Sequence, residues 1–157
     1  MIFLTVGTQL PFDRLVAAVD DWAGASRARV FAQTGAGKYR PRHCEHADYL
    51  APALADDLFR KADLIVSHAG MGSILTALKY QKRILILPRR ASLGEHRNEH
   101  QLATARWLGR KPGVFVAEEA DDVARLLNAR EVLQSGEAIS DHADPALLAR
   151  LREFVSQ

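Results

Sequence analysis

One stretch near the middle of the chain constrains the fold more than any other, because a short apolar run leads through glycines into a helix-forming segment. Residues 63–66 (Asp-Leu-Ile-Val) have the apolar, partly β-branched character of a buried parallel strand. Gly70, Gly72 and Ser73 then stand where the strand would end and the next helix begin. Free backbone N–H groups at a helix start attract anions, most often phosphate. The stretch therefore predicts an α/β fold with an anion site, although a tight turn with a serine N-cap would use the same residues.

The rest of the chain alternates strand and helix patterns, which predicts an α/β fold, a parallel sheet with helices on both faces. We expect strands at residues 2–6, 29–33, 48–50, 64–67, 83–88 and 114–116. We expect helices from Pro11 to Trp22, at 53–62, from the glycine loop to about Tyr80, and at 97–108, 121–129 and 145–157. Residues 135–144 have the composition of a loop.

Composition narrows the functional class. With 157 residues, 48% hydrophobic and 25% charged, the chain is expected to form a single globular domain, 1–157. The net charge is only +2, and the basic residues are scattered without interleaved aromatics, which argues against nucleic acid as the main ligand. The single cysteine, Cys44, excludes an internal disulfide and suits the cytosol. No run resembles a signal peptide or a membrane span, so we expect a cytoplasmic protein.

The loops that follow the predicted strands would converge on one edge of the sheet. Ligands of open α/β sheets bind at this carboxyl edge. The converging loops are Gly7-Thr8, 35–37, 68–73 and 89–100. His68 would stand directly at the end of a strand, and an imidazole there favours a ligand site over an ordinary turn.

Several well-known motifs are incomplete. Residues 35–38 (Gly-Ala-Gly-Lys) lack the spacing of a P-loop, and Tyr39 replaces its Ser or Thr. Gly7 stands alone after the first strand, so the dinucleotide fingerprint fails, and no Gly-x-Ser-x-Gly elbow occurs. His96, Glu99 and His100 match the His-x-x-Glu-His pattern of inverted zinc proteases, in which two histidines one helical turn apart share a metal. A zinc hydrolase with these residues stays open as an alternative, without an evident third ligand.

Short motifs in a defined order carry a resemblance to a known family. They are Thr5-Val6-Gly7-Thr8 with Phe12-Asp13, the loop 67–75, Pro88-Arg89, and the segment 96–102. Across about residues 1–130 the chain resembles the carboxyl-terminal, donor-binding domain of family 28 glycosyltransferases, and within it the small soluble subunits of two-component UDP-sugar transferases. The resemblance implies a Rossmann-like parallel sheet that forms the donor-binding half of a GT-B glycosyltransferase.

The resemblance also implies roles for individual residues. The catalytic residues would be His68, Glu95 and His100, with the general base on this chain or on a partner. The substrate-binding residues would be Gly7, Thr8, Tyr49, Leu50, Gly70, Met71, Gly72, Ser73, Thr76, Arg89, Gln101 and Thr104. Tyr49 and Leu50 would hold the uracil, while His100 and Gln101 would reach the diphosphate and the sugar hydroxyls. Many family members carry a glutamate for the ribose hydroxyls where this chain has Thr76.

The function implied is that of an inverting glycosyltransferase subunit. It would move a hexose from a UDP-sugar to a polyprenyl-linked acceptor in exopolysaccharide or capsule synthesis. A membrane-anchored partner would supply the acceptor site and recruit the chain to the inner face of the membrane. Backbone amides at a helix start, His68 and Arg89 or Arg90 would stabilise the leaving diphosphate, so no metal or cofactor would be required. A non-catalytic nucleotide-sugar-binding or regulatory module is the alternative.

The predicted terminal helix, 145–157, has an apolar side. This side is made by Leu147, Leu148, Leu151, Phe154 and Val155. It would contact the partner, pack on the chain's own core, or drive self-association.

Overall fold

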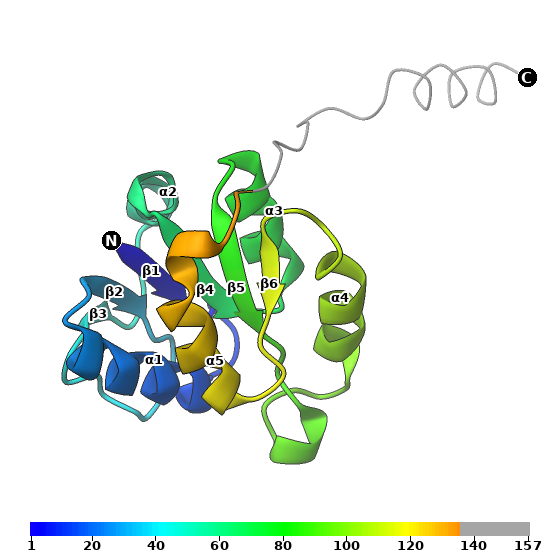
Figure 1. Ribbon diagram of the computed structural model, residues 1–157. Helices are drawn as coiled ribbons and strands as arrows, with labels where there is room; N and C mark the ends of the chain where they lie inside the picture. The colour runs from blue at the N-terminus through cyan, green and yellow to red at the C-terminus, as the bar shows by residue number, and fades with distance from the viewer. Residues whose placement is uncertain (136–157) are drawn as a thin grey trace, which may run out of the picture.

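The computed structural model describes residues 1–135, which form one parallel sheet with helices on both of its faces (Figure 1). The sheet has six strands in the order β3-β2-β1-β4-β5-β6, and every neighbouring pair is parallel. The strands are β1 (Ile2–Thr5), β2 (Val30–Gln33), β3 (Glu45–Ala47), β4 (Leu64–His68), β5 (Arg83–Leu87) and β6 (Val114–Val116). The expected Rossmann-like α/β fold is therefore confirmed.

Helices cover the sheet in two layers. One face carries α1 (Asp13–Ser26) and α5 (Ala120–Asn128), which lie side by side (Figure 1). The other carries α2 (Pro52–Lys61), α3 (Met71–Lys79) and α4 (His100–Leu108). Short 3-10 helices η1 (Ala91–Leu93) and η2 (Arg130–Val132) follow β5 and α5.

Alternation along the central strands produces two apolar cores. Leu4 and Val66 pack with the residues of α1 and α5, whereas their neighbours Phe3 and Ile65 pack with those of α2, α3 and α4. All four residues are completely buried. Because both faces of the sheet are covered, the strands are continuous apolar runs, which is why the sequence revealed them.

The strand order reverses between β1 and β4. From β1 the chain moves outward to β2 and β3, then returns to β4 on the opposite side of β1. The loops after β1 and β4 therefore diverge, and a crevice opens between them at the carboxyl edge of the sheet. This arrangement places the glycine loop and the loop after β1 at the position where open α/β folds bind ligands.

One predicted strand was misplaced. The third strand comprises Glu45–Ala47, not residues 48–50. It is an edge strand with exposed side chains, so it lacks the apolar run that marks the buried strands. The Asp48 carboxylate accepts hydrogen bonds from Thr34 Oγ1 and Arg40 Nη1, which fixes the turn that follows β3.

Two predicted helix starts were also wrong. The first helix begins at Asp13, two residues after Pro11. The helix expected from residue 97 begins at His100, because Asn98 Oδ1 accepts the His100 N–H at 3.2 Å and the residues before it form a turn. The predicted loop 135–144 and helix 145–157 lie almost entirely outside the described residues. Within residues 1–135, no helix is long and apolar enough to cross a membrane.

Candidate functional site

A cavity of about 610 Å³ opens at the carboxyl edge of the sheet, between the loops after β1 and β4 and the first turns of α3 and α4. It brings together most of the predicted site residues: Gly7, Thr8, His68, Gly70, Met71, Gly72, Ser73, Thr76, Arg89, His100, Gln101 and Thr104. Tyr49, Leu50 and Glu95 do not line this cavity. Predicted site residues from four separate segments thus meet at one place, as expected for the loops after β1, β4 and β5, whereas the loop 35–37 does not line the cavity.

The start of α3 faces this cavity without a cap. Gly70 is the N-cap residue, and no side chain of the described chain caps the helix, so the serine N-cap considered from the sequence is wrong. A Cβ added at Gly72 would meet no atom within 4 Å, which shows that the backbone there borders open space. The first-turn N–H groups and the positive end of the helix dipole are therefore available to an anion.

The glycines on either side of His68 make room for its ring. A Cβ added at Gly70 would stand 2.1 Å from His68 Nε2, and one added at Gly7 would stand 2.9 Å from Cε1. Gly7 also has a φ of +75°, which favours glycine. On the far side of the ring, Ser67 Oγ lies 3.1 Å from Nδ1 at hydrogen-bonding distance. Gly70 is required by the imidazole as well as by any ligand.

The environment of His68 keeps its imidazole neutral at neutral pH. Burial, together with the nearby positive charge of Arg89, lowers the pKa of His68 to about 4. The neutral ring offers one N–H donor and one lone pair. It can therefore orient a ligand by hydrogen bonding without adding positive charge to the cavity.

Arg89 is a buried cation at the floor of the cavity. Its side chain is 3% exposed, and Nη2 donates to the carbonyl oxygens of Val6 at 2.8 Å and Leu10 at 2.6 Å. The guanidinium carbon lies 5.0 Å from the centre of the Phe12 ring. Burial lowers the pKa of Arg89 to about 10, so it stays charged at neutral pH.

The charge of Arg89 is not fully compensated. Its Nε is buried without a hydrogen-bond partner, and no carboxylate among residues 1–135 forms an ion pair with it. A buried charge of this kind is costly until an opposite charge approaches. The cavity therefore combines a helix N-terminus with an incompletely paired cation, and both favour an anionic ligand.

Gln101 ties the ends of two strands to α4. It is 6% exposed, and its Oε1 accepts the N–H of Ala69 at 3.2 Å and the N–H of Arg89 at 3.0 Å. The resemblance had assigned this side chain to the sugar hydroxyls, but the amide oxygen serves the backbone. In the described part of the chain Nε2 donates no hydrogen bond, and it remains for a ligand.

Thr76 has a partly committed hydroxyl. Its Oγ1 donates to the carbonyl oxygen of Gly72 at 2.8 Å, one helical turn earlier. The oxygen can still accept a hydrogen bond from a ligand hydroxyl. Thr76 thus offers one acceptor where a glutamate would offer two oxygens.

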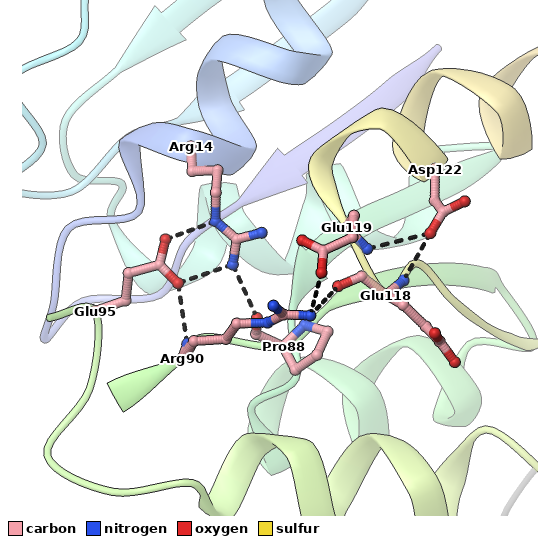
Figure 2. Close-up of polar contacts among 7 residues, drawn as sticks. All are labelled: Arg14, Pro88, Arg90, Glu95, Glu118, Glu119 and Asp122. Carbon is pink, nitrogen blue, oxygen red and sulfur yellow. Dashed lines mark hydrogen bonds and ion pairs between the residues drawn. The ribbon is translucent and has the colours of Figure 1, made fainter. Parts of the chain in front are cut away.

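Glu95 lies outside the cavity and is held by two arginines (Figure 2). Its carboxylate accepts hydrogen bonds from Arg14 Nε at 2.7 Å, Arg14 Nη2 at 2.8 Å and the Arg90 N–H at 3.0 Å. Burial raises the pKa of Glu95, but these hydrogen bonds and charges outweigh it and hold the pKa below its usual value. Glu95 is bound by Arg14 of α1, and its place outside the cavity gives the catalytic assignment from the sequence no support.

The other side of this network reaches α5. Arg90 Nη2 bonds the carbonyl oxygen of Glu118 and the carboxylate of Glu119, which forms a capping box with Asp122 at the start of α5 (Figure 2). The loop after β5 is therefore anchored to both helices of one sheet face.

Tyr49 and Leu50 are not at the cavity wall. Tyr49 is 54% exposed, and Leu50 is half-buried against the apolar core formed with α2, α3 and α4. They follow β3, at the far end of the sheet from β5 and β6. Because Tyr49 and Leu50 do not line the cavity, the structure gives no support to their expected contact with the uracil.

Several lining residues were missed by sequence reasoning. They are Val6, Gln9, Leu10, Phe59 and Ala69, and His96, which the sequence suggested only as a zinc ligand, also lines the cavity. Gln33 was also missed: its Oε1 accepts from Thr5 Oγ1 at 2.6 Å, and its Nε2 donates to the carbonyl oxygen of Gly7 at 3.4 Å. Thr5 and Gln33 are polar residues in otherwise apolar strands. This departure from the apolar pattern is the signal that could have identified them as support for the Gly7 loop.

His96 and His100 do not share a helical turn. His96 precedes α4, whereas His100 is its first residue, so the spacing that a zinc site needs is not formed on a helix. Across residues 1–135, no three His, Cys, Asp or Glu side chains gather in a way that could hold a metal ion. The described residues therefore give the zinc hydrolase alternative no support.

The sequence matches a known family model over residues 1–129, described as the glycosyltransferase family 28 C-terminal domain. A human relative, UDP-N-acetylglucosamine transferase subunit ALG13, is 29% identical over 126 residues, covering 73% of this chain and 11% of that protein. The chain thus spans only about a tenth of the length of this relative.

Solved structures share the fold at low sequence identity. An NMR structure of ALG13 has a TM-score of 0.61 at 17% identity, covering 99% of this chain and 96% of that one. MurG of Acinetobacter baumannii has a TM-score of 0.60 at 16% identity, covering 82% of this chain and 40% of that one. The glycotransferase of kitacinnamycin has a TM-score of 0.58 at 19% identity, covering 97% and 37%.

Proposed function

Because the chain belongs to the family of glycosyltransferase family 28 C-terminal domains, we propose that it is the donor-binding, catalytic subunit of an inverting glycosyltransferase. It transfers a hexose from a UDP-sugar to a polyprenyl-linked acceptor in exopolysaccharide or capsule synthesis. A membrane-anchored partner supplies the acceptor site and recruits this cytoplasmic chain to the inner face of the membrane. The name of the human relative, a subunit of a UDP-N-acetylglucosamine transferase, supports both the donor class and the need for a partner.

The observation that carries this proposal is the meeting of the uncapped α3 N-terminus and the buried Arg89 in one cavity. A nucleotide diphosphate supplies the negative charge that both features lack. Gly72 allows the phosphate oxygens to approach the backbone N–H groups closely, because no side chain stands there. The Rossmann-like fold is that of the GT-B glycosyltransferase domains with which it aligns.

Transfer of the sugar requires stabilisation of the leaving diphosphate. The acceptor hydroxyl attacks the anomeric carbon from the face opposite the diphosphate, the bond from that carbon to the diphosphate oxygen breaks, and UDP leaves with the negative charge. Preformed backbone dipoles and the Arg89 guanidinium stabilise that charge with little reorganisation. The proton of the acceptor hydroxyl passes to a general base.

The pKa and the position of the candidate residues narrow the choice of that base. His68, with a pKa near 4, is a weak base at neutral pH, so it serves better as a hydrogen-bonding group that orients the donor. Glu95 is engaged by Arg14 and lies outside the cavity. His100 at the start of α4 lines the cavity, and it or a group on the partner takes the proton. No metal or cofactor takes part in this scheme.

Two observations also favour a second candidate function, a non-catalytic nucleotide-sugar-binding or regulatory module: no carboxylate of the described residues lines the cavity, and His68 is a weak base at neutral pH. Both functions require binding of a UDP-sugar, and only the first requires transfer. Transfer measured with the purified chain plus membranes that contain the partner separates the two.

Binding itself is tested by thermal unfolding with UDP, UDP-sugars and ADP. A ligand at 100 times its dissociation constant stabilises the folded chain by about 2.7 kcal/mol. The Gly72→Val variant should fold, since a side chain there meets no atom, and should lose this stabilisation because it fills the phosphate position. Leu75→Val is the matched control, because Leu75 is exposed on the same helix and does not line the cavity. Equal stabilisation of the Gly72→Val variant and the wild type would contradict the proposed site.

A further inference from the structure

The carboxyl-terminal end of α4 and the turn after it form a basic and aromatic surface. We define this α4 surface by Arg106, Trp107, Arg110 and Lys111, all of which are exposed. Trp107 is 62% exposed, which is unusual for the largest apolar side chain. Within residues 1–135, no other part of the chain covers the Trp107 side chain.

Within residues 1–135, the cations of the α4 surface form no ion pair with an acidic side chain. Residues 100–117 include no Asp or Glu. Among the residues that the structure describes, no side chain or carbonyl group bonds Arg106, Arg110 or Lys111 through its charged group. Some other surface cations are paired, as in Arg40–Asp48, Arg60–Asp56 and Lys61–Asp57, whereas the exposed Arg27, Lys38 and Arg97 are not. The α4 surface differs from these separate residues because three unpaired cations stand there together with the exposed Trp107.

A second cavity adjoins this surface, with a volume of about 440 Å³. Arg90, Arg106 and Arg110 line it together with the acidic residue Glu118. Its apolar lining residues are Pro88, Leu102, Ala105 and Val116. The guanidinium of Arg90 is held by Glu119 and by the carbonyl oxygen of Glu118, and its Nε is buried without a partner (Figure 2). Guanidinium groups beside an apolar floor suit a phosphate group that carries an apolar chain.

We propose that the α4 surface binds directly to the headgroup layer of an anionic lipid bilayer. Lys and Arg side chains near such a layer are attracted to its negative surface, and Trp prefers the boundary between headgroups and acyl chains. The α4 surface supplies both at one place, and the second cavity offers room for a lipid phosphate. An acidic protein surface would pair with the same cations, but in that case the chain need not bind anionic vesicles.

The amino-terminal half of α4 explains why this placement matters. His100, Gln101 and Thr104 line the first cavity, so a bilayer bound at the α4 surface lies next to the candidate site. The chain itself then adds to membrane recruitment, beyond what a membrane-anchored partner provides. This inference does not depend on sugar transfer.

Vesicle sedimentation with the purified full chain tests the inference. We expect binding to vesicles of phosphatidylcholine mixed with phosphatidylglycerol, weak binding to phosphatidylcholine alone, and release at high salt. Each removed charge should weaken binding about fivefold, so the combined Arg106→Gln, Arg110→Gln and Lys111→Gln variant should bind about a hundredfold more weakly. Trp22 is buried, so a blue shift of tryptophan fluorescence on vesicle addition reports on Trp107.

A control of equal charge separates a local surface from net charge. The combined Arg60→Gln, Lys61→Gln and Arg125→Gln variant also removes three positive charges, but these residues lie on α2 and α5. It should bind vesicles almost as wild type does, and both variants should keep their UDP affinity because none of these residues lines the first cavity. Absence of binding to anionic vesicles, an equal loss in both variants, or an unshifted fluorescence spectrum would each overturn the inference.

Discussion

The guanidinium of Arg14 holds the carboxylate of Glu95 with two hydrogen bonds, from Nε at 2.7 Å and from Nη2 at 2.8 Å, although 81 residues separate them (Figure 2). The same Nη2 also bonds the carbonyl oxygen of Pro88 at 3.2 Å. Both side chains are mostly buried. The pair joins the first turn of α1 to the loop after β5, and this loop carries His96 to the cavity wall.

Glu95→Gln should therefore act through the position of this loop. The change keeps the side-chain size, removes the charge and leaves Arg14 without a counterion, so we expect a loss of about 1 kcal/mol in the free energy of unfolding. UDP affinity should fall several-fold. Denaturant unfolding and calorimetric titration measure the two effects, and Arg40→Gln, which breaks an exposed pair with Asp48, is a control that should change neither.

A double-mutant cycle with Arg14→Met sharpens this prediction. If the two residues act as a pair, the variant with both changes should lose clearly less stability than the sum of the single losses. A Glu95→Gln variant with normal stability and UDP affinity but a large fall in turnover would restore the catalytic assignment instead.

Gly70→Ala should disturb His68 more than it disturbs α3. The new Cβ would stand 2.1 Å from Nε2, so the ring has to move, at a cost of about 1–3 kcal/mol in the free energy of unfolding. His68→Ala combined with Gly70→Ala should recover part of that loss because the obstructing ring is gone. Thermal unfolding of the three variants measures it, and strictly additive losses would show that the glycine serves another purpose.

His68 should make the folded chain less stable in acid. Its pKa of about 4 in the folded state lies below the usual 6.5, so the unfolded chain binds a proton more readily between these values. Stability should fall as the pH drops from 6.5 to 4, by about 2–3 kcal/mol from this group, and the group adds nothing further below pH 4.

Comparison with His68→Gln isolates that contribution, since carboxylates with lowered pKa values, such as Glu95, also lose stability in acid. The variant should show a flatter stability profile between pH 6.5 and 4. NMR titration of the His68 ring should further show its pKa rising when UDP binds, because the diphosphate offsets the charge of Arg89. An unperturbed ring pKa in the free protein would refute this account of the site.

Gln101→Ala should weaken UDP and UDP-sugar alike. The amide oxygen of Gln101 satisfies the N–H groups of Ala69 and Arg89, and leaving two buried donors unpaired should cost about 2–4 kcal/mol of stability. The resemblance alone would instead predict that the Gln101→Ala variant loses much more affinity for UDP-sugar than for UDP. Thr104→Val is the control, since Thr104 lines the same cavity without supporting the backbone. A selective loss of UDP-sugar affinity in the Gln101→Ala variant would return Gln101 to a sugar-binding role.

The elements predicted best from the sequence are those that a local residue pattern determines. Strands such as Leu64–His68 are buried on both faces and appear as apolar runs, and the glycines after β4 mark the turn into α3. The edge strand Glu45–Ala47 was misplaced because its exposed residues carry no such run. The start of α4 was misplaced because residues 95–99 form bends rather than helix, and the His100 N–H bonds the side-chain oxygen of Asn98.

Site roles that depend on distant partners were beyond the sequence. Nothing local to Glu95 indicates that Arg14 faces it, and nothing local to Gln101 indicates that its oxygen bonds the ends of β4 and β5. Residue type therefore identified which side chains gather near the cavity, while the direction in which each one points required the folded chain.

The double role of Gln101 bears on protein engineering. A library intended to change the sugar that the chain accepts would ordinarily vary every residue assigned to the sugar, and Gln101 would be among the first. Here most substitutions at that position would also remove the hydrogen bonds from α4 to the N–H groups of Ala69 and Arg89, so the screen would partly select for stability rather than for new specificity. Keeping Gln101 fixed and varying His100 and Thr104 on the same helix offers shape changes that leave the backbone hydrogen bonds intact.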